Sequence, residues 1–417
     1  MLTRRKSHSR RSSFLTGGKI KKESIVFSVL FFCFLLWFSN IFLGACYLPN
    51  TINEGLTTDA KQDSAITNVE FTFLAHYPAN RTTRGLGFAM RDNYIYSIIG
   101  YNPTIIDVSN ISNPTFVADY PVENGRMNTL ALRDDYLYLG SSSDLEILDI
   151  SDLSNITKIG QCNTTNPVEK IVLQGNYAYL AAENNGLVIV NITDPTNPFK
   201  IGSYKTNIDT WDIALKESII FIANSNGTDN VLVIVDVSDP TNPSKIGYYD
   251  NLEYPEMAGL SITVNGSYAY LGTEEYGLFI LDITNTTQPQ LISHFYGNTE
   301  QPIGELGNEE IIWGTFVKEQ YVFEAAGATS LYVLDFSEPK SPKLNGQYSG
   351  AYLLYGVHVH DTYLFLQDVL LGIMILNMTF SSTTGRPLGQ LIAIIVAPIL
   401  GVAIITVVVT LYKKKKN

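Results

Sequence analysis

The chain has 417 residues, of which 45% are hydrophobic and 12% aromatic, whereas only 16% are charged. This composition excludes an intrinsically disordered protein and favours a strand-rich one with a large buried core. The net charge of −12 is unevenly distributed, because residues 49–387 hold 16 basic and 39 acidic groups, a net of −23. Such acidity argues against nucleic acid as a partner of the central region.

The N-terminal region has the pattern of a membrane anchor. Residues 1–23 contain eight Lys and Arg side chains and one acid, and residues 24–43 follow without a charge. About 20 apolar residues suffice for a helix to span a bilayer, and basic residues in front of the span predict a cytoplasmic N-terminus. We therefore expect a transmembrane helix or signal anchor over 24–47 and a linker over 48–68. A cleaved signal peptide stays open, as does lipidation of Cys46, because Leu43–Cys46 resembles a lipoprotein cleavage box.

The C-terminal region repeats this arrangement in reverse. A linker at 380–387 leads into residues 388–412, which are uncharged and contain Pro398, a residue that transmembrane helices tolerate. The basic tail 413–417 follows directly and predicts a second cytoplasmic end. The protein is thus expected in the cell membrane, held in lipid by two spans, with its acidic central region on the extracellular side.

Residues 69–379 are built from one repeating unit. Its clearest copy runs from Val231 to Tyr249: an apolar β-branched run, a turn rich in Asp, Pro and Asn, and a second short apolar run. Successive copies align on an acidic or amide residue at intervals of 42, 42, 45, 46, 53 and 42 residues. This column, each member followed two residues later by Ser or Thr, comprises Asp107, Asp149, Asn191, Asp236, Asp282, Asp335 and Asn377. An Asx side chain before a hydroxyl residue caps a tight turn, so we interpret the column as architectural.

Four strand signals per unit and a period in the forties predict a seven-bladed β-propeller of four-stranded antiparallel blades. Each unit contains an inner strand with small residues on one face, an aromatic strand, an apolar strand and an outer strand. The last unit lacks an outer strand, and Val69–Tyr77 is an unpaired strand of the same character at the front. We expect Val69–Tyr77 to pair with Gly372–Asn377 and close the ring, which hides exposed sheet edges.

Leu232–Asp236 spells LVIVD, and the chain resembles the LVIVD-repeat β-propeller proteins of bacterial and archaeal surfaces over residues 69–379. The first and last units depart from the motif, with Ile105–Asp107 and Met374–Asn377 in its place. The resemblance implies a surface or secreted binding module, and it implies little about the ligand.

The loops at the start of the inner strands and between the second and third strands form one face, the top, which predicts the ligand-binding surface. Both linkers leave from the opposite face, the bottom, so we expect the bottom near the bilayer and the top facing outward. Aromatic and charged side chains in these loops suit a sugar or a basic peptide. The candidate residues are Arg84, Arg126, Trp211, Glu256, Glu274, Tyr276, Trp313 and Tyr355. The alternative is a solvated acidic rim with Trp211, Trp313 and Tyr355 packed between blades.

Metal-binding patterns are weak. His358 and His360 share a strand face, but both fall in columns of the repeat, which favours structural roles. The run 224–229 faintly resembles a calcium loop without its acidic ligands, so no cofactor is expected and calcium is the weak exception. Several Asn-X-Ser/Thr sequons predict glycosylation of an extracellular domain. The candidates are Asn80, Asn163, Asn226, Asn265 and Asn285.

The sequence thus predicts a membrane-anchored, extracytoplasmic β-propeller that binds an unknown protein or glycan without catalysis. The alternative is a metal-assisted hydrolase or lyase acting on cell-surface glycans. No acid–base pair or metal-ligand set stands out from the repeat background, so the binding module is the preferred hypothesis.

Overall fold

A computed structural model describes residues 67–78, 87–122, 126–206, 208–225, 230–250, 257–274, 276–295, 311–326 and 330–382. Within these ranges no helix has the length and apolar character needed to cross a bilayer. The two sequence-predicted spans, 24–47 and 388–412, lie outside the described residues.

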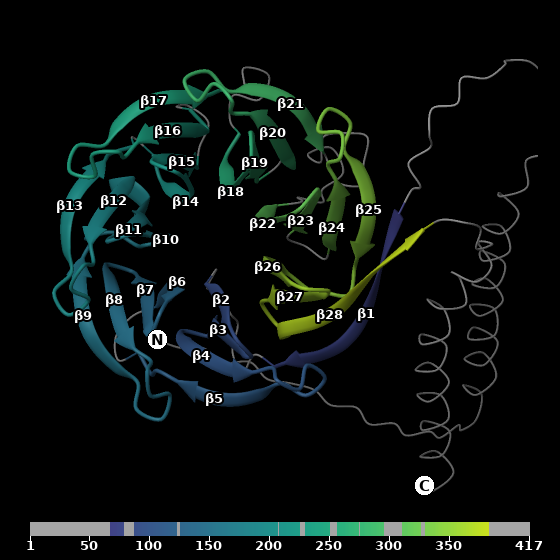
Figure 1. Cartoon of the computed structure of the whole chain (residues 1–417), viewed down its shortest axis with the longest axis horizontal. Coiled ribbons are helices and arrows are strands. Elements are labelled where there is room, and N and C mark those ends of the chain that lie inside the picture. Colours follow the sequence, from purple (N-terminus) through teal and green to yellow (C-terminus); the bar gives the residue numbers. More distant parts are fainter. Residues whose placement is uncertain are drawn as a thin grey trace, which may run out of the picture. The chain divides into compact units, whose positions relative to one another are not determined.

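The described residues form seven four-stranded antiparallel sheets arranged as the blades of a propeller (Figure 1). Blade 1 contains β2 (Phe88–Arg91), β3 (Tyr94–Ile99), β4 (Asn102–Asp107) and β5 (Thr115–Asp119). Blade 2 contains β6 (Met127–Arg133), β7 (Tyr136–Ser141), β8 (Asp144–Asp149) and β9 (Thr157–Asn163). Blade 3 contains β10 (Lys170–Gln174), β11 (Tyr177–Ala181), the short 3₁₀ helix η1 (Glu183–Asn185), β12 (Leu187–Asn191) and β13 (Phe199–Tyr204).

The remaining blades follow the same order from the inner to the outer strand. Blade 4 contains β14 (Thr210–Lys216), β15 (Ile219–Asn224), β16 (Leu232–Asp236) and β17 (Ser244–Tyr249). Blade 5 contains β18 (Gly259–Asn265), β19 (Tyr268–Thr273), β20 (Leu278–Asp282) and β21 (Gln290–Phe295). Blade 6 contains β22 (Ile312–Lys318), β23 (Tyr321–Ala326), β24 (Ser330–Asp335) and β25 (Lys343–Tyr348). Blade 7 contains β26 (Leu354–His360), β27 (Tyr363–Asp368), β28 (Gly372–Ser382) and, as its outer strand, β1 (Thr67–Tyr77).

The ring is closed by strands from both ends of the central region, as the sequence predicted. β1 pairs antiparallel with β28 from Tyr77↔Ile373 to Thr67↔Ser382, with one bulge between Phe73 and Ala75. β27 pairs with β28 only as far as Asn377, so Met378–Ser382 and Thr67–Phe71 continue past the blade as a two-stranded ribbon. Gln367 also joins blade 7 to blade 1, because its Nε2 donates to the Gly87 carbonyl (2.9 Å) and to Ser97 Oγ (2.8 Å).

The hydrophobic core lies between blades, because each cluster draws its side chains from two neighbours. One cluster, for example, joins Tyr138 and Ile147 of blade 2 to Ile171 and Leu180 of blade 3. The apolar second and third strands are buried on both faces, which explains why the LVIVD-like runs do not alternate with polar residues.

The aligned Asp and Asn column caps the turn after the third strand. The carboxylate of Asp236 accepts a hydrogen bond from the Ser238 backbone N–H (2.8 Å), and Asn191 accepts one from Thr193 (2.9 Å). A second Asx turn follows in the same loop, where Asp239 accepts from the Thr241 N–H (3.0 Å). These hydrogen bonds lower the pKa of the Asp236 and Asp239 carboxyls. Asp239 is exposed and Asp236 is half-buried.

A basic residue at the end of several inner strands reaches the next blade. Lys216 Nζ donates to the Gly266 carbonyl (2.6 Å), and Lys318 Nζ donates to the Asp361 carbonyl (2.8 Å). Arg91 and Arg133 make the equivalent bonds to the carbonyls of Asp134 and Gly175. Each acceptor belongs to the first residue of the turn between the inner and second strands, where φ is positive.

Gly266→Ala is expected to lower the free energy of unfolding by about 1 kcal/mol, because Gly266 has φ +56° and an L-residue is strained there. No atom lies within 4 Å of the Cβ that alanine would add, so backbone strain alone accounts for the loss. Denaturant titration of the full chain in detergent measures it, with Ser267→Ala as the control. Equal stability of Gly266→Ala and wild type would show that the turn adopts positive φ without cost.

Candidate functional site

A cavity of about 170 Å³ lies on the axis of the ring at the ends where the inner strands begin. The register of several inner strands slips by one residue at this end, for example between Thr210 and Asp212 and between Ile312 and Gly314. Each slip is a bulge that leaves one residue unpaired and redirects its side chain. The residues skipped in this way are Asn128, Trp211, Leu260, Trp313 and Tyr355. All of these except Asn128 line the cavity, so the bulges build its mouth.

One side of the cavity is aromatic and comes from blades 6, 7 and 1. Trp313 and Tyr355 pack with ring centroids 4.9 Å apart. Deeper in, the imidazole of His358 lies between Phe88 (4.9 Å) and Phe316 (5.0 Å). Burial lowers the pKa of His358 to about 4, so its ring is uncharged at neutral pH. This side offers ring faces and no charge.

The opposite side is polar and comes from blades 3 and 4. Lys170 Nζ lies 3.2 Å from Asp212 Oδ1. Asp212 also accepts backbone N–H bonds from Ile213 and, in blade 5, from Ile262, both at 2.9 Å. The carboxylate is therefore held in place from two blades, and the lysine ammonium stays partly exposed at the cavity.

Glu169 adds a buried carboxyl beside this pair. It is 7% exposed, and Asn128 Nδ2 donates to its Oε1 at 2.7 Å. Burial raises the pKa of Glu169 to about 7, with a further increase from Glu183, while Arg126 acts in the opposite direction. Burial and the charge of Asp209 raise the pKa of Glu183 as well. Arg126 therefore lies near two carboxyl groups of blade 3, those of Glu169 and Glu183.

Two polar atoms at the cavity have no hydrogen-bond partner within the part of the chain that the structure describes. They are the indole N–H of Trp211 and the side-chain oxygen Oε1 of Gln367, and both atoms are buried. Gln367 is held by the hydrogen bonds from its Nε2 to blade 1, so its oxygen has a defined position. The cavity thus presents one donor and one acceptor in addition to its charged groups.

The structure brings together three of the residues that the sequence singled out, since Trp211, Trp313 and Tyr355 all line the cavity. They are partly exposed there. Arg126 lies close enough to influence Glu169, which lines the cavity. Glu274 and Tyr276 lie in the loop between β19 and β20 and do not line it. Arg84 and Glu256 lie outside the described residues. Ligand binding by these residues stays a prediction.

Sequence reasoning missed Phe88, Glu169, Lys170, Asp212, Phe316 and Gln367 and assigned His358 to a structural role. A signal was present, because several of these residues break a column of the repeat. Lys170 and Asp212 share a column with Gly87, Thr129 and Ser261, and Phe316 and His358 share one with Ala89, Ala131 and Ala214. Gln367 aligns with Gly140, Ala181 and Gly272. A large or charged residue in a column of small ones is typical of a site added to a repeat scaffold.

Among the described residues, no three His, Cys, Asp or Glu side chains are grouped so that they could hold a metal ion. His360 is exposed, with Nε2 3.8 Å from Asp361 Oδ2. The weak calcium candidate falls largely on residues 226–229, which lie outside the described ranges. Of the glycosylation candidates, Asn163, Asn265 and Asn285 are exposed, and Asn80 and Asn226 lie outside the described ranges.

The LVIVD repeat family matches the chain at residues 89–122, 124–164, 167–206, 209–251, 259–296 and 313–350, which together exceed half of its length. The chain belongs to the LVIVD repeat family. The six matches fall on blades 1 to 6, and blade 7 is the one whose strands come from both ends of the repeat region.

Solved structures share the fold of this LVIVD repeat protein at low identity. A crystal structure of the computationally designed Ika8 protein is 10% identical, with a TM-score of 0.53 over 73% of this chain and 99% of that one. A chain of the mitotic checkpoint complex is 9% identical, with a TM-score of 0.58 over 78% and 98%. These likenesses show the propeller fold alone. No curated protein matches the chain.

Glu169→Gln is expected to remove a pH dependence of stability. The pKa of Glu169 is raised in the folded state, so its contribution to stability is present below pH 4.5 and is lost as the pH rises through about 7. Glutamine keeps the acceptor for Asn128 and cannot ionise. The variant should match wild type near pH 4.5 and exceed its free energy of unfolding by about 3 kcal/mol at pH 8. Denaturant titrations at both values test this, and parallel pH profiles of the two proteins would contradict it.

Proposed function

We propose that this protein is a non-catalytic binding module that takes its ligand in the axial cavity. The observation that carries the proposal is the division of the cavity into an aromatic side and a polar side. Trp313 and Tyr355 form the first, and Lys170, Asp212 and Glu169 form the second. Cavities lined by rings and a few fixed polar groups are typical of small-ligand sites.

The chemistry of the cavity favours a glycan over a protein as the ligand. One face of a sugar ring is lined by C–H groups and packs on aromatic rings, while its hydroxyls need both donors and acceptors. The indole N–H of Trp211 and Oε1 of Gln367 supply one of each. The volume of about 170 Å³ corresponds to about six water molecules, which suits a single sugar unit at the end of a chain.

A metal-assisted hydrolase or lyase is the second candidate, and the described residues favour it less. The Asp212 carboxylate already accepts two backbone N–H hydrogen bonds and pairs with Lys170, so it is poorly placed to transfer a proton. Among the described residues that line the cavity, Glu169, with its pKa raised to about 7, is the one best suited to acid–base work. Incubation of the protein with oligosaccharides and Ca²⁺ or Zn²⁺ distinguishes the candidates, because only an enzyme shortens the chains.

The proposal includes a tether to the cell membrane, with the propeller on the extracellular side. It is supported by the uncharged stretches 24–43 and 388–412 with their basic flanks. The described ends of the propeller support it too, because Thr67 pairs with Ser382 and both predicted linkers leave from one place. The cavity mouth lies at the opposite end of the inner strands, where a ligand outside the cell could reach it.

Intrinsic fluorescence offers a direct test, because the chain has three tryptophans and two of them, Trp211 and Trp313, line the cavity. In a Trp37→Phe variant of the full chain, the emission reports on the cavity alone. We expect a saturable change with at least one member of a panel of methyl glycosides of neutral, acidic and N-acetylated hexoses. If no sugar changes the emission but tryptic peptides do, the ligand is a peptide and not a glycan.

A further inference from the structure

At one exposed position of the outer strands, half of the ring carries lysine and the other half carries apolar side chains. In each blade, one residue of the outer strand pairs with the third-strand residue that directly precedes the aligned Asp or Asn. We call this outer-strand residue the rim position, and its side chain is exposed in all seven blades. From blade 1 to blade 7 this position holds Phe116, Lys158, Lys200, Lys245, Leu291, Leu344 and Phe73. Blades 2, 3 and 4 thus carry a lysine rim. Blades 5, 6, 7 and 1 are neighbours around the ring (Figure 1) and carry an apolar rim.

Other exposed apolar side chains gather on the same half of the ring. Among the described residues, Phe380 of blade 7 is exposed on the ribbon. Tyr101 of blade 1 and Tyr352, Leu370 and Leu371 of blade 7 are also exposed, but they lie in loops at the end of the ring where the inner strands begin, apart from the rim position. The exceptions are Phe199 of blade 3 and Tyr248 of blade 4, whose ring lies 4.3 Å below the ammonium of Lys245. An exposed apolar surface confined to one side of a molecule is typical of a protein or membrane contact.

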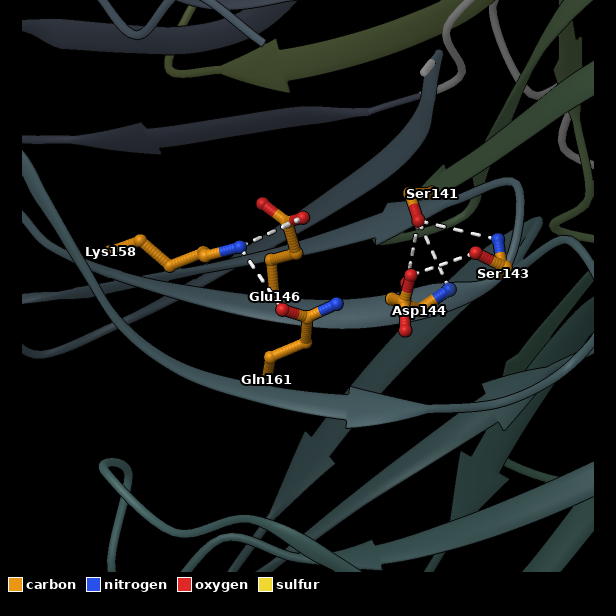
Figure 2. A network of polar contacts seen from close by, with 6 residues as sticks. All are labelled: Ser141, Ser143, Asp144, Glu146, Lys158 and Gln161. Carbon is orange, nitrogen blue, oxygen red and sulfur yellow. Dashed lines mark hydrogen bonds and ion pairs between the residues drawn. The ribbon is translucent and has the colours of Figure 1, made fainter. Parts of the chain in front are cut away.

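The lysine rim has the character of a surface in water. Lys158 Nζ lies 3.4 Å from Glu146 Oε1 and donates to Gln161 Oε1 at 3.1 Å (Figure 2). Lys245 Nζ donates to Asn230 Oδ1 at 2.8 Å. These lysines have polar partners along their own blades, whereas Phe73, Phe116 and Leu344 expose apolar atoms.

Both chain ends leave the propeller within the apolar half. The ribbon formed by Thr67–Phe71 and Met378–Ser382 extends from blade 7, and Phe380 on it packs against Tyr321 of blade 6 with centroids 4.8 Å apart. Only residues 383–387 separate Ser382 from the uncharged stretch that begins at Leu388. Six residue steps reach at most about 20 Å. If the proposed tether holds, the bilayer therefore begins within about 20 Å of Ser382, at the end of this ribbon.

We propose that the apolar rim and Phe380 contact the lipid surface. Blades 5, 6, 7 and 1 would then face the membrane, and the lysine rim of blades 2, 3 and 4 would face water. A bilayer is the occupant that the chain ends favour, because the tether emerges beside the apolar rim and not beside the lysine rim. This inference rests on the proposed tether. It places the cavity mouth, at the far end of the inner strands, away from lipid.

Photo-crosslinking in vesicles tests the contact. The full chain is reconstituted into phosphatidylcholine vesicles with p-benzoylphenylalanine at position 73, 116 or 344, and lipid adducts are measured by mass spectrometry after illumination. Phe199 is the matched control, because it is an outer-strand phenylalanine with 52% exposure, close to the 54% of Phe116, on the lysine side. We expect lipid adducts at 73, 116 and 344 and only background at 199.

Vesicle flotation, run on the same samples, separates the two proposals. If the protein floats with the vesicles but lipid adducts at 116 and 199 are equal or absent, the lipid contact is wrong and the tether is still supported. Crosslinks to a second copy of the chain from positions 73, 116 and 344 also overturn it, in favour of self-association. Protein that does not float overturns the tether and the lipid contact together.

Discussion

Gly202→Val is expected to lower the free energy of unfolding by about 3 kcal/mol or more. Gly202 lies in the outer strand β13, and a Cβ there would come within 2.0 Å of the Pro240 carbonyl oxygen in the turn of the next blade. This oxygen belongs to the backbone, so it cannot rotate away as a side chain would. The LVIVD repeat uses the same contact at Gly160 and Gly247, which meet Pro195 and Thr286 in the same way. Glycine therefore lets the outer strands of blades 2, 3 and 4 pack closely against the turn of the following blade.

Denaturant titration followed by circular dichroism measures this loss, with Ser203→Val as the control at the adjacent exposed position. Gly202→Ser should have a smaller effect than valine. Blade 5 has Ser293 at the equivalent position, and its hydroxyl donates to the Pro339 carbonyl at 2.7 Å. Similar stability of Gly202→Val and Ser203→Val would show that the contact between outer strand and turn is not required.

Trp313→Ala is expected to weaken glycoside binding at least thirtyfold, which corresponds to about 2 kcal/mol. Trp313 is placed at the cavity mouth by the bulge in β22, and its ring packs against Tyr355. Alanine removes the larger ring from the aromatic side and leaves the polar groups of blades 3 and 4 in place. Isothermal titration calorimetry with the glycoside that responds in the fluorescence panel measures the change.

Phe199→Ala is the matched control for Trp313→Ala, because it removes an exposed aromatic side chain far from the cavity. It should bind as wild type does. A double variant with Lys170→Met tests the polar side and should weaken binding further. Unchanged affinity of Trp313→Ala would move the ligand site away from the cavity and toward the loop residues Glu274 and Tyr276.

The positions of the strands could be predicted from the sequence because their causes are local. The Asx turn at Asp236, the apolar run before it and the alternation in the outer strand after it are all set within about 20 residues. Even the closure between β1 and β28 could be predicted, because the last unit lacks an outer strand and the chain offers a spare one.

The candidate site could be predicted only in part. Trp211, Trp313 and Tyr355 stand out in the sequence because they are large aromatics at the start of inner strands. Glu169, Lys170 and Gln367 do not, because the first two lie at the start of β10 in blade 3 and the third lies in β27 of blade 7, and only the closed ring brings them to one axis. The bulges that direct Trp211 and Trp313 into the cavity are shifts of register between strands, and a single strand carries no signal for them.

The sequence by itself determined the repeat, the number of blades, the turns and the uneven charge, because each depends on neighbours along the chain. The tertiary structure alone decided which side chains share the axial cavity, why Glu169 has a pKa of about 7 and how the rim divides into apolar and lysine halves. The physical reason is that burial and proximity around a ring depend on residues more than 40 positions apart, which meet only once the last blade has closed on the first.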